Sequence, residues 1–293
     1  MAGRHVMRTW PRPRRLLSLT AAATFVSIAW LLAPTSHGSV DARAASGLPT
    51  LTIAMNGKSI KVGGVLQSGA VNVKSTVADE VQGDPALVLL RHGASIRKAL
   101  EAVNSHNGDL DYLDPYGSIV LDAAAARGTS EVQTFLAPGR YAALDGSSGA
   151  AIPPYSEFTI TRAAHPAKLP RPEGIITTID FGFRGADTLH DGELVRFQNR
   201  GFLLHMGIAL PVSNATDAAT VTAFVRAGEN LEARSLLAGA VVDFDIGLSH
   251  GDMQQEVIRA RPGIYVLVCL MTTQDGRDMA QLGMERTIRI TRQ

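Results

Sequence analysis

The sequence predicts an all-β chain made of two tandem β-sandwiches, each with a short helical insertion. Three observations favour this fold class. The 293 residues include 28 glycines and 14 prolines, which separate many short runs rich in Val, Ile, Thr and Phe. A Pro-Gly-x-Tyr turn occurs twice, 124 residues apart, and an Ile-Thr-Arg triplet occurs twice, 130 residues apart. Each copy contains a series of short strands with turn signals between them, which is typical of a β-sandwich.

The first 44 residues have the three-part layout of a secretory signal. Five arginines within residues 1–15 precede an apolar stretch over residues 16–32, and Ala42-Arg43-Ala44 forms an A-x-A cleavage pattern. An uncleaved anchor helix is the alternative, because the apolar stretch is at the short limit for a membrane span. We therefore expect a bacterial protein that is secreted or held in the cell envelope or periplasm. Any contact with a membrane is expected only through this N-terminal segment.

Export changes the charge of the chain. Cleavage after Ala44 removes six of the 28 basic residues and one of the 27 acidic residues. The mature chain then has 22 basic and 26 acidic residues, a net charge of −4. This charge removes the electrostatic basis for binding nucleic acid. The single cysteine, Cys269, excludes a disulfide within the chain.

The first sandwich is expected over residues 48–163. In DPALVLLRHGASIRKALEAVN an apolar strand precedes a helix, whose apolar stripe is Ile96, Leu100 and Val103. The segments SEVQTFLAPGRYAAL and YSEFTITRA supply later strands. Three aspartates within residues 109–114 raise the alternative of a Ca²⁺ loop. A solvated turn is favoured, because their spacing is not that of an EF-hand.

A Pro-rich linker and a second sandwich follow. Residues 164–172 contain three prolines, which disfavour helix and strand and suit an extended connection. The second sandwich is expected over residues 173–293, with a helix whose apolar stripe is Val221, Phe224 and Val225. Its expected strands are IITTIDFGF, LLHMGIALPV, AVVDFDIGL, MQQEVIRA, GIYVLVCLM and RTIRITR.

Four features of the second half occur in a characteristic order. A strand, turn and strand end in Asn199-x-Gly201, His205 follows, the strand PGIYVLVC ends at Cys269, and Gly283-Met284 precedes the last strand. In this order of parts the second half resembles the cupredoxins, the plastocyanin-like Greek-key β-sandwiches that bind copper. Through the repeat, the first half is more weakly similar to the same family.

The resemblance implies a copper site that contains His205, Cys269, Met284 and a second histidine from the loop between the last two. That loop has no histidine, and Met279 is the soft donor near the expected place. A set of one imidazole, one thiolate and two thioethers is soft and favours Cu(I). The alternative for each of these side chains is ordinary packing in an apolar core.

The first half is expected to lack a copper site. It has no cysteine, and Asp145 stands at the position that matches Cys269 in the repeat. Pro85 is expected at the position of His205. The first sandwich is therefore predicted to have a structural or partner-binding role.

The sequence contains none of the motifs that mark the common catalytic sites. We therefore expect a non-catalytic exported binding protein, not an enzyme, whose second sandwich binds copper if it binds any metal. The expected partners are a copper ion and an extracytoplasmic protein of unknown identity. The alternative is a copper-dependent redox or electron-transfer protein that uses the same residues.

Overall fold

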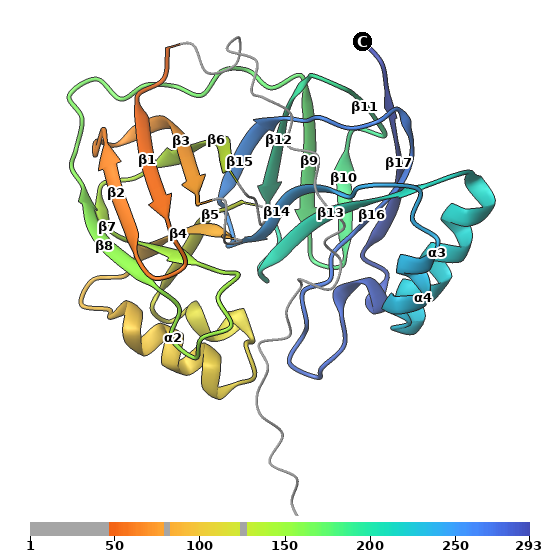
Figure 1. The fold of residues 1–293 in the computed structure, drawn as a ribbon, viewed down its shortest axis with the longest axis horizontal. Helices are drawn as coiled ribbons and strands as arrows, with labels where there is room; N and C mark the ends of the chain where they lie inside the picture. Colours follow the sequence, from red (N-terminus) through yellow and green to blue (C-terminus); the bar gives the residue numbers. More distant parts are fainter. Residues whose placement is uncertain (1–46, 79–82, 124–127) are drawn as a thin grey trace, which may run out of the picture.

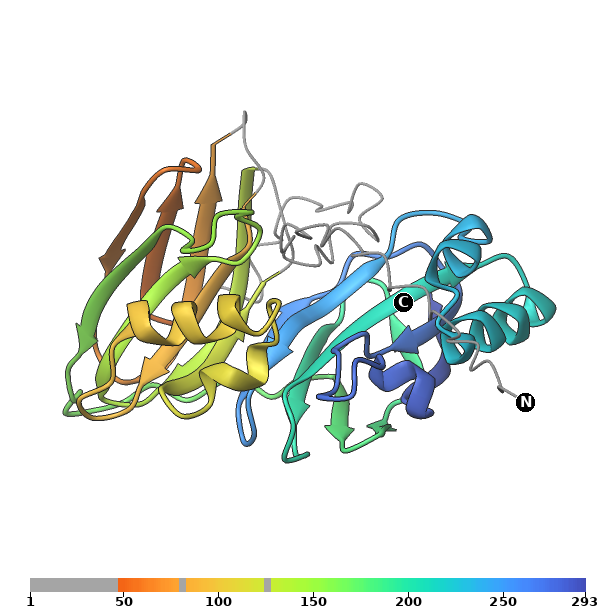
Figure 2. The same ribbon diagram turned by 90° about the horizontal axis from the view of Figure 1, so that it is seen from below.

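The computed structural model of the protein describes residues 47–78, 83–123 and 128–293, so the predicted signal segment lies outside the described residues. The chain forms two halves that lie side by side (Figure 1). Helix α2 lies against the first half, and α3 and α4 flank the outer side of the second (Figure 2). None of the helices in the described part of the chain is long and apolar enough to cross a membrane.

The described residues of the first half form eight strands. One layer is a four-stranded sheet in the order β5-β4-β7-β8, and the other layer contains β6, β3, β1 and β2. These strands are β1 Thr50–Met55, β2 Ile60–Gly64, β3 Gly69–Val77, β4 Pro85–Leu90, β5 Gly117–Asp122, β6 Gly128–Leu136, β7 Gly139–Asp145 and β8 Tyr155–Ile160. The insertion between β4 and β5 contains α2 Ile96–Ser105 and the short 3-10 helix η2 Leu110–Leu113.

The second half contains nine strands. One layer is a five-stranded sheet in the order β11-β17-β16-β13-β14, and the other contains β10, β9, β12 and β15. These strands are β9 Gly174–Ile179, β10 Gly182–Gly185, β11 Thr188–His190, β12 Leu194–Asn199, β13 His205–Val212, β14 Val242–Leu248, β15 Met253–Val257, β16 Gly263–Val268 and β17 Glu285–Thr291. Its helices are α3 Ala215–Ala227, α4 Asn230–Ser235 and the 3-10 helix η3 Met279–Leu282.

The predicted helical insertions are confirmed, and their apolar stripes face the core. Ile96, Leu100 and Val103 of α2 are buried, as are Val221 and Val225 of α3. Each helix begins with a capping side chain, which accepts hydrogen bonds from backbone N–H groups that have no partner within the helix. The all-β class with one helical insertion in each half is thus correct.

The two Pro-Gly-x-Tyr turns adopt the same local structure. Gly139 begins β7 and Gly263 begins β16. The hydroxyl of Tyr141 donates to the carbonyl of residue 137 at 2.9 Å, and the hydroxyl of Tyr265 donates to the carbonyl of residue 261 at 2.7 Å. Each tyrosine thus bonds back four residues, which supports a duplicated unit.

The strand registers correct one detail of the repeat. Strand β4 pairs with β7 so that Ala86 faces Leu144, and β13 pairs with β16 so that Ile208 faces Val268. Since Leu144 and Val268 are equivalent, Asp145 does match Cys269. The prediction that Pro85 matches His205 is wrong by two residues, because a loop insertion shifts the register, and Gly83 stands there instead. Neither residue supplies a copper donor.

One sheet runs through both halves. Its eight strands follow the order β10-β9-β12-β15-β6-β3-β1-β2, and the link between the halves is the short β15–β6 pairing. At this seam the amide of Gln255 donates to Oε1 of Gln133 at 2.9 Å. The amide of Gln254 donates to the carbonyls of Asp122 at 3.1 Å and Phe244 at 2.7 Å.

The Pro-rich segment 164–172 lies along the same seam. The carbonyl of Ala167 accepts the backbone N–H of Ala70 at 2.9 Å, and the carbonyl of Pro170 accepts the amide of Gln255 at 3.2 Å. The segment therefore contacts both halves. The domain boundaries at 48–163 and 173–293 remain a prediction.

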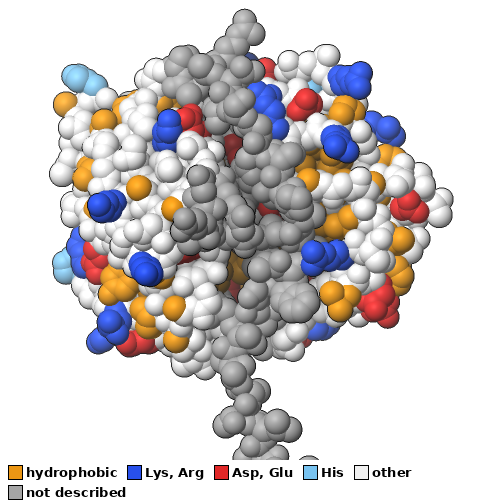
Figure 3. Space-filling model, in the orientation of Figure 1, with side chains coloured by type: hydrophobic (Ala, Val, Ile, Leu, Met, Phe, Trp, Pro, Cys, Tyr) orange, Lys and Arg blue, Asp and Glu red, His pale blue; other side chains and the backbone are white. Residues whose placement is uncertain are grey.

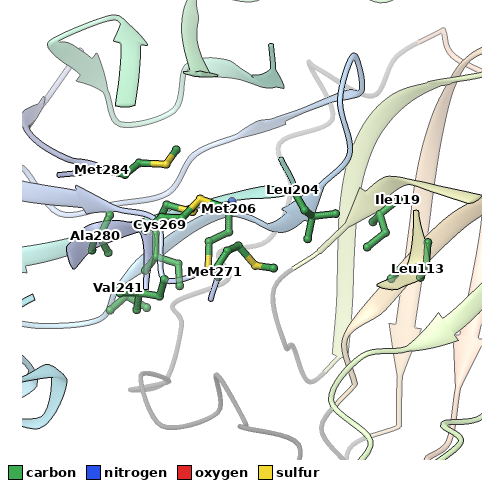
Figure 4. Close-up of a cluster of buried hydrophobic side chains, with 14 of the residues drawn as sticks. Leu113, Ile119, Leu204, Met206, Val241, Cys269, Met271, Ala280 and Met284 are labelled. Atoms are coloured by element: carbon green, nitrogen blue, oxygen red, sulfur yellow. Dashed lines mark hydrogen bonds between the residues drawn. The ribbon is translucent and has the colours of Figure 1, made fainter. Parts of the chain in front are cut away.

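A hydrophobic cluster also crosses the seam. It contains Val88 and Ile119 from the first half and Met206, Val266 and Cys269 from the second. Figure 4 shows Leu204 between the sulfur-containing side chains of the second half and Ile119 of the first. Each half also has a smaller cluster of its own. Lys and Arg side chains are spread over both halves of the face in Figure 3 instead of forming one basic patch.

Candidate metal centre

His205 is the first residue of β13, a strand whose eight residues are all buried. Its side chain has no exposed surface. Nε2 lies 3.1 Å from Oδ1 of Asp180, which follows β9. The same oxygen accepts the backbone N–H groups of Phe202 at 2.9 Å and Leu203 at 3.2 Å. Asp180 therefore fixes both the imidazole and the loop that leads into β13.

The charges at this pair determine which nitrogen of His205 carries a proton. Partial burial raises the pKa of Asp180, but the N–H groups of Leu203 and Phe202 and the imidazole outweigh it and hold this pKa below its usual value. Burial lowers the pKa of His205, although Asp180 opposes the shift. A neutral imidazole beside an ionised carboxylate carries its proton on Nε2. Nδ1 then presents a lone pair to its neighbours.

Asn199 and Gly201 form the turn that places this pair. The amide of Asn199 donates to the carbonyls of Leu203 and Leu248, both at 2.8 Å, and its oxygen accepts the N–H of Gly201 at 2.8 Å. A Cβ atom at position 201 would overlap Nε2 of His205 and Oδ1 of Asp180. The Asn-x-Gly motif is therefore the structural support of the imidazole.

Cys269 lies directly after β16 and is completely buried. Its sulfur accepts the backbone N–H of Met206 at 3.4 Å. Burial raises the pKa of the thiol to about 12. Without a cation beside it, the sulfur is therefore protonated at neutral pH, and a thiolate at this place requires a bound positive charge.

Met279 connects the two predicted ligands. Its sulfur lies 3.1 Å from Nδ1 of His205 and 3.7 Å from the sulfur of Cys269. The loop reaches this position because η3 folds back over the strand end, where the N–H of Ala280 donates to the carbonyl of Cys269 at 2.9 Å. Imidazole, thiol and thioether thus meet at one buried point.

Met284 is placed less directly. It is fully buried in the same cluster as Cys269, and its carbonyl accepts the N–H of Cys269 at 3.2 Å. Met206 and Met271 belong to this cluster as well. Figure 4 shows the side chains of Cys269, Met206 and Met271 close together. The structure brings His205, Cys269 and Met279 into contact, and it joins Met284 to Cys269 through this backbone hydrogen bond.

The sequence reasoning missed Asp180. Its signal was an acid placed directly after the strand GIITTI, where a charged side chain can face the end of the sandwich. Its partner His205 is 25 residues away, so no local spacing connects them. The carboxylate is the kind of partner that orients a metal-binding imidazole through its second nitrogen.

The chemistry of these donors fits copper and not a hard cation. Among the described residues, no three His, Cys, Asp or Glu side chains are grouped so that they could hold a metal ion. A site here therefore depends on thioether sulfur in addition to His205 and Cys269. Such soft donors select Cu(I).

In the first half, the aspartates of the alternative Ca²⁺ loop make local contacts. Oδ1 of Asp109 accepts the N–H of Asp111 at 3.0 Å, and Asp114 forms an exposed ion pair with Arg91 at 3.1 Å. Burial, and then the charge of Asp109, raises the pKa of Asp111 to about 6. These contacts are those of a capped turn, as the sequence favours.

Comparisons with known proteins give only distant similarities. No protein-family model and no curated protein matches the chain. It is similar to a reduced auracyanin from Roseiflexus castenholzii at 18% identity and a TM-score of 0.25, over 40% of this chain and 94% of that one.

Two copper proteins also match over most of the chain. A copper nitrite reductase from Nitrosomonas europaea has 14% identity and a TM-score of 0.23, over 83% of this chain and 93% of that one. A multicopper oxidase has 11% identity and a TM-score of 0.23, over 86% of this chain and 100% of that one. Such values carry no functional argument.

The fold itself is clear from the strand arrangement. Each half has two layered sheets, a helical insertion and the same tyrosine turn before an equivalent strand. In the second half the order of Asn-x-Gly turn, His205, Cys269 and Met284 occurs on those strands. In fold, the chain is a tandem of two cupredoxin-like β-sandwiches.

Proposed function

We propose that the protein is an exported, non-catalytic binding protein whose second sandwich binds copper as Cu(I). The ligands are Nδ1 of His205, the sulfur of Cys269 and the sulfur of Met279, with Met284 beside them. The observation that carries the proposal is the contact of Met279 with both other donors, at 3.1 and 3.7 Å. A copper ion bound here would act as a soft Lewis acid and accept lone pairs from this nitrogen and these two sulfurs.

The donor set favours storage or transfer of Cu(I) over electron transfer. A blue-copper carrier uses two imidazoles and a thiolate so that both oxidation states are held. Here the second imidazole is replaced by Met279, whose thioether binds Cu(II) weakly. The electron-transfer alternative therefore requires that Cu(II) also binds and forms a thiolate-to-copper charge-transfer band.

Export is part of the proposal. It is supported by the arginine-rich and apolar layout of the first 44 residues. A buried thiol is also suited to an oxidising compartment, because reagents cannot reach Cys269 at 0% exposure.

Anaerobic titration of Cu(I) against a competing chelator tests the site. We expect one Cu(I) per chain, a loss of binding in Cys269→Ala, and a weakening of at least about tenfold in Met279→Leu. Met55→Leu is the matched control, because Met55 is buried in the first sandwich and should leave the affinity unchanged. Unchanged affinity in Cys269→Ala would show that the thiol is only a packing residue.

A second variant tests the oxidation state. Met279→His restores the second imidazole that the cupredoxins use. We expect Cu(II) to give an intense visible charge-transfer band in this variant and none in the unmodified protein. A band in the unmodified protein would favour the electron-transfer alternative.

A further inference from the structure

A group of acidic side chains meets where the two sandwiches join. Strand β14 of the second half packs against β5 of the first, and the N–H of Asp122 at the end of β5 donates to the side chain of Gln254 at 3.1 Å. The acidic side chains that influence one another across this seam are Asp84, Asp122, Asp145, Asp243, Asp245 and Glu256.

Six buried carboxylate oxygens of this group accept no hydrogen bond from the described residues. They are Oδ1 of Asp84, Oδ1 of Asp122 and both oxygens of Asp243 and Asp245. Asp245 has no exposed surface and Asp122 is 5% exposed. Native proteins leave few buried polar atoms unsatisfied, and each such atom calls for an explanation, of which a bound ion is one.

No positive group within the described chain balances these acids. The ion pairs between described residues all involve other carboxylates. Burial, followed by the charges of Asp122, Asp243 and Asp145, raises the pKa of Asp84 well above its usual value. Burial and mutual repulsion therefore oppose ionisation of these acids from both halves, and a bound cation would be needed to hold them as carboxylates.

We propose that this seam binds a linear organic diammonium ligand. A primary ammonium group has three N–H donors, so two such groups supply the six donors that the six oxygens lack. A single metal ion fits less well, because no three described carboxylates are grouped at metal-ligand spacing. Two ammonium groups separated by a flexible chain reach carboxylates that stand apart.

The ligand connects the two sandwiches. Asp84 and Asp122 belong to the first half, and Asp243 and Asp245 to β14 of the second. The bound cation removes the repulsion among these carboxylates and so stabilises the seam. The charge of Asp245 contributes to the raised pKa of Cys269, so the seam adjoins the copper donors, although none of its carboxylates is a proposed copper ligand.

Isothermal titration and thermal unfolding at pH 8 with 1,4-diaminobutane test the proposal. We expect the diamine to bind and to raise the unfolding midpoint, with n-butylamine at least about tenfold weaker. The Asp243→Asn variant should weaken the diamine by about tenfold or more, because a neutral amide replaces one carboxylate. Asp114→Asn, at an exposed acid of the first half, is the matched control.

Further measurements distinguish a small diamine from a basic peptide as the source of the ammonium groups. A Lys-Lys peptide that binds more tightly than the diamine would identify a basic peptide as the source of the ammonium groups. Equal stabilisation by Mg²⁺, or no stabilisation by any amine, would overturn the proposal. Cu(I) affinity of Asp243→Asn should match that of the unmodified protein, so that failure at the seam is distinguishable from failure at the copper site.

Discussion

The equivalent strand ends of the two halves use one backbone geometry with different side chains. In the second half the N–H of Met206 donates to the sulfur of Cys269 at 3.4 Å. In the first half the N–H of Asp84, the equivalent of Met206, donates to Oδ1 of Asp145 at 3.1 Å. The duplicated scaffold keeps the donor, whereas the acceptor is a soft sulfur in one half and a hard carboxylate in the other.

The loops after these positions explain why only one half gathers soft ligands. The second loop is six residues longer and contains η3, which returns Met279 to the sulfur of Cys269. In the first half Ser147 satisfies Asp145 directly, with its N–H at 3.1 Å and its hydroxyl at 2.7 Å. A small change in loop length thus decides whether the strand end becomes a donor cluster or a closed turn.

The largest effect is expected for Cys269→Asp, which places the aspartate of the first half at the equivalent position of the second half. The new carboxylate would have the backbone N–H groups of Met206 and Met271 as donors and would face the Met279 sulfur. We expect a stability loss of about 3 kcal/mol in urea unfolding and loss of Cu(I) binding. Full retention of stability would show that the two strand ends are interchangeable.

Gln254→Ala tests whether the halves are one folding unit. This side chain makes three buried hydrogen bonds, two across the seam to the N–H and carbonyl of Asp122 and one within its own half to the carbonyl of Phe244. We expect unfolding in urea to remain a single transition with a loss of about 3 kcal/mol. Gln198→Ala, which removes one bond to Thr177, is the control and should cost about 1 kcal/mol. Two separate transitions would contradict a shared sheet that couples the halves.

Asp180→Asn tests a contact that only the second half has, because the first half has no histidine at the equivalent strand end. The amide keeps the size of Asp180 but loses its charge beside Nε2 of His205. We expect Cu(I) affinity to fall by about 10- to 100-fold, with little change in the unfolding midpoint. Chelator competition and thermal unfolding on the same sample separate the two effects.

The acidic seam predicts a pH dependence in the absence of added amine. Burial raises the pKa of Asp243 to about 7, and burial and then Asp243 raise that of Glu256 to about 8. Asp84 and Asp245 also face Asp243. Since these folded-state pKa values exceed the unfolded value near 4, the folded state holds protons that the unfolded chain releases, and stability falls as pH rises from about 4 to about 8.

Asp243→Asn is the variant that checks this effect. It should flatten the fall of the unfolding midpoint over that pH range, whereas Asp114→Asn should leave the slope unchanged. An unmodified protein whose stability rises with pH over this range would contradict the buried acidic seam.

The amino-acid sequence by itself determined the features that depend on local patterns. Apolar periodicity, turn chemistry and the repeated tyrosine motif predict the strands, the helical stripes and the duplication, because each is encoded within a few residues. The order of His205, Cys269 and Met284 predicts which side chains approach, and Met279 was the soft donor expected near the place of the missing histidine.

Only the tertiary structure decided the contacts between distant parts of the chain. The β15–β6 pairing joins residues about 120 positions apart. Asp180 reaches His205 from the turn after β9, and the acids of the seam come from both halves. No local periodicity encodes such contacts, because they arise from how complete sheets pack. The roles of Asp180 and the acidic seam therefore follow from the packed structure alone.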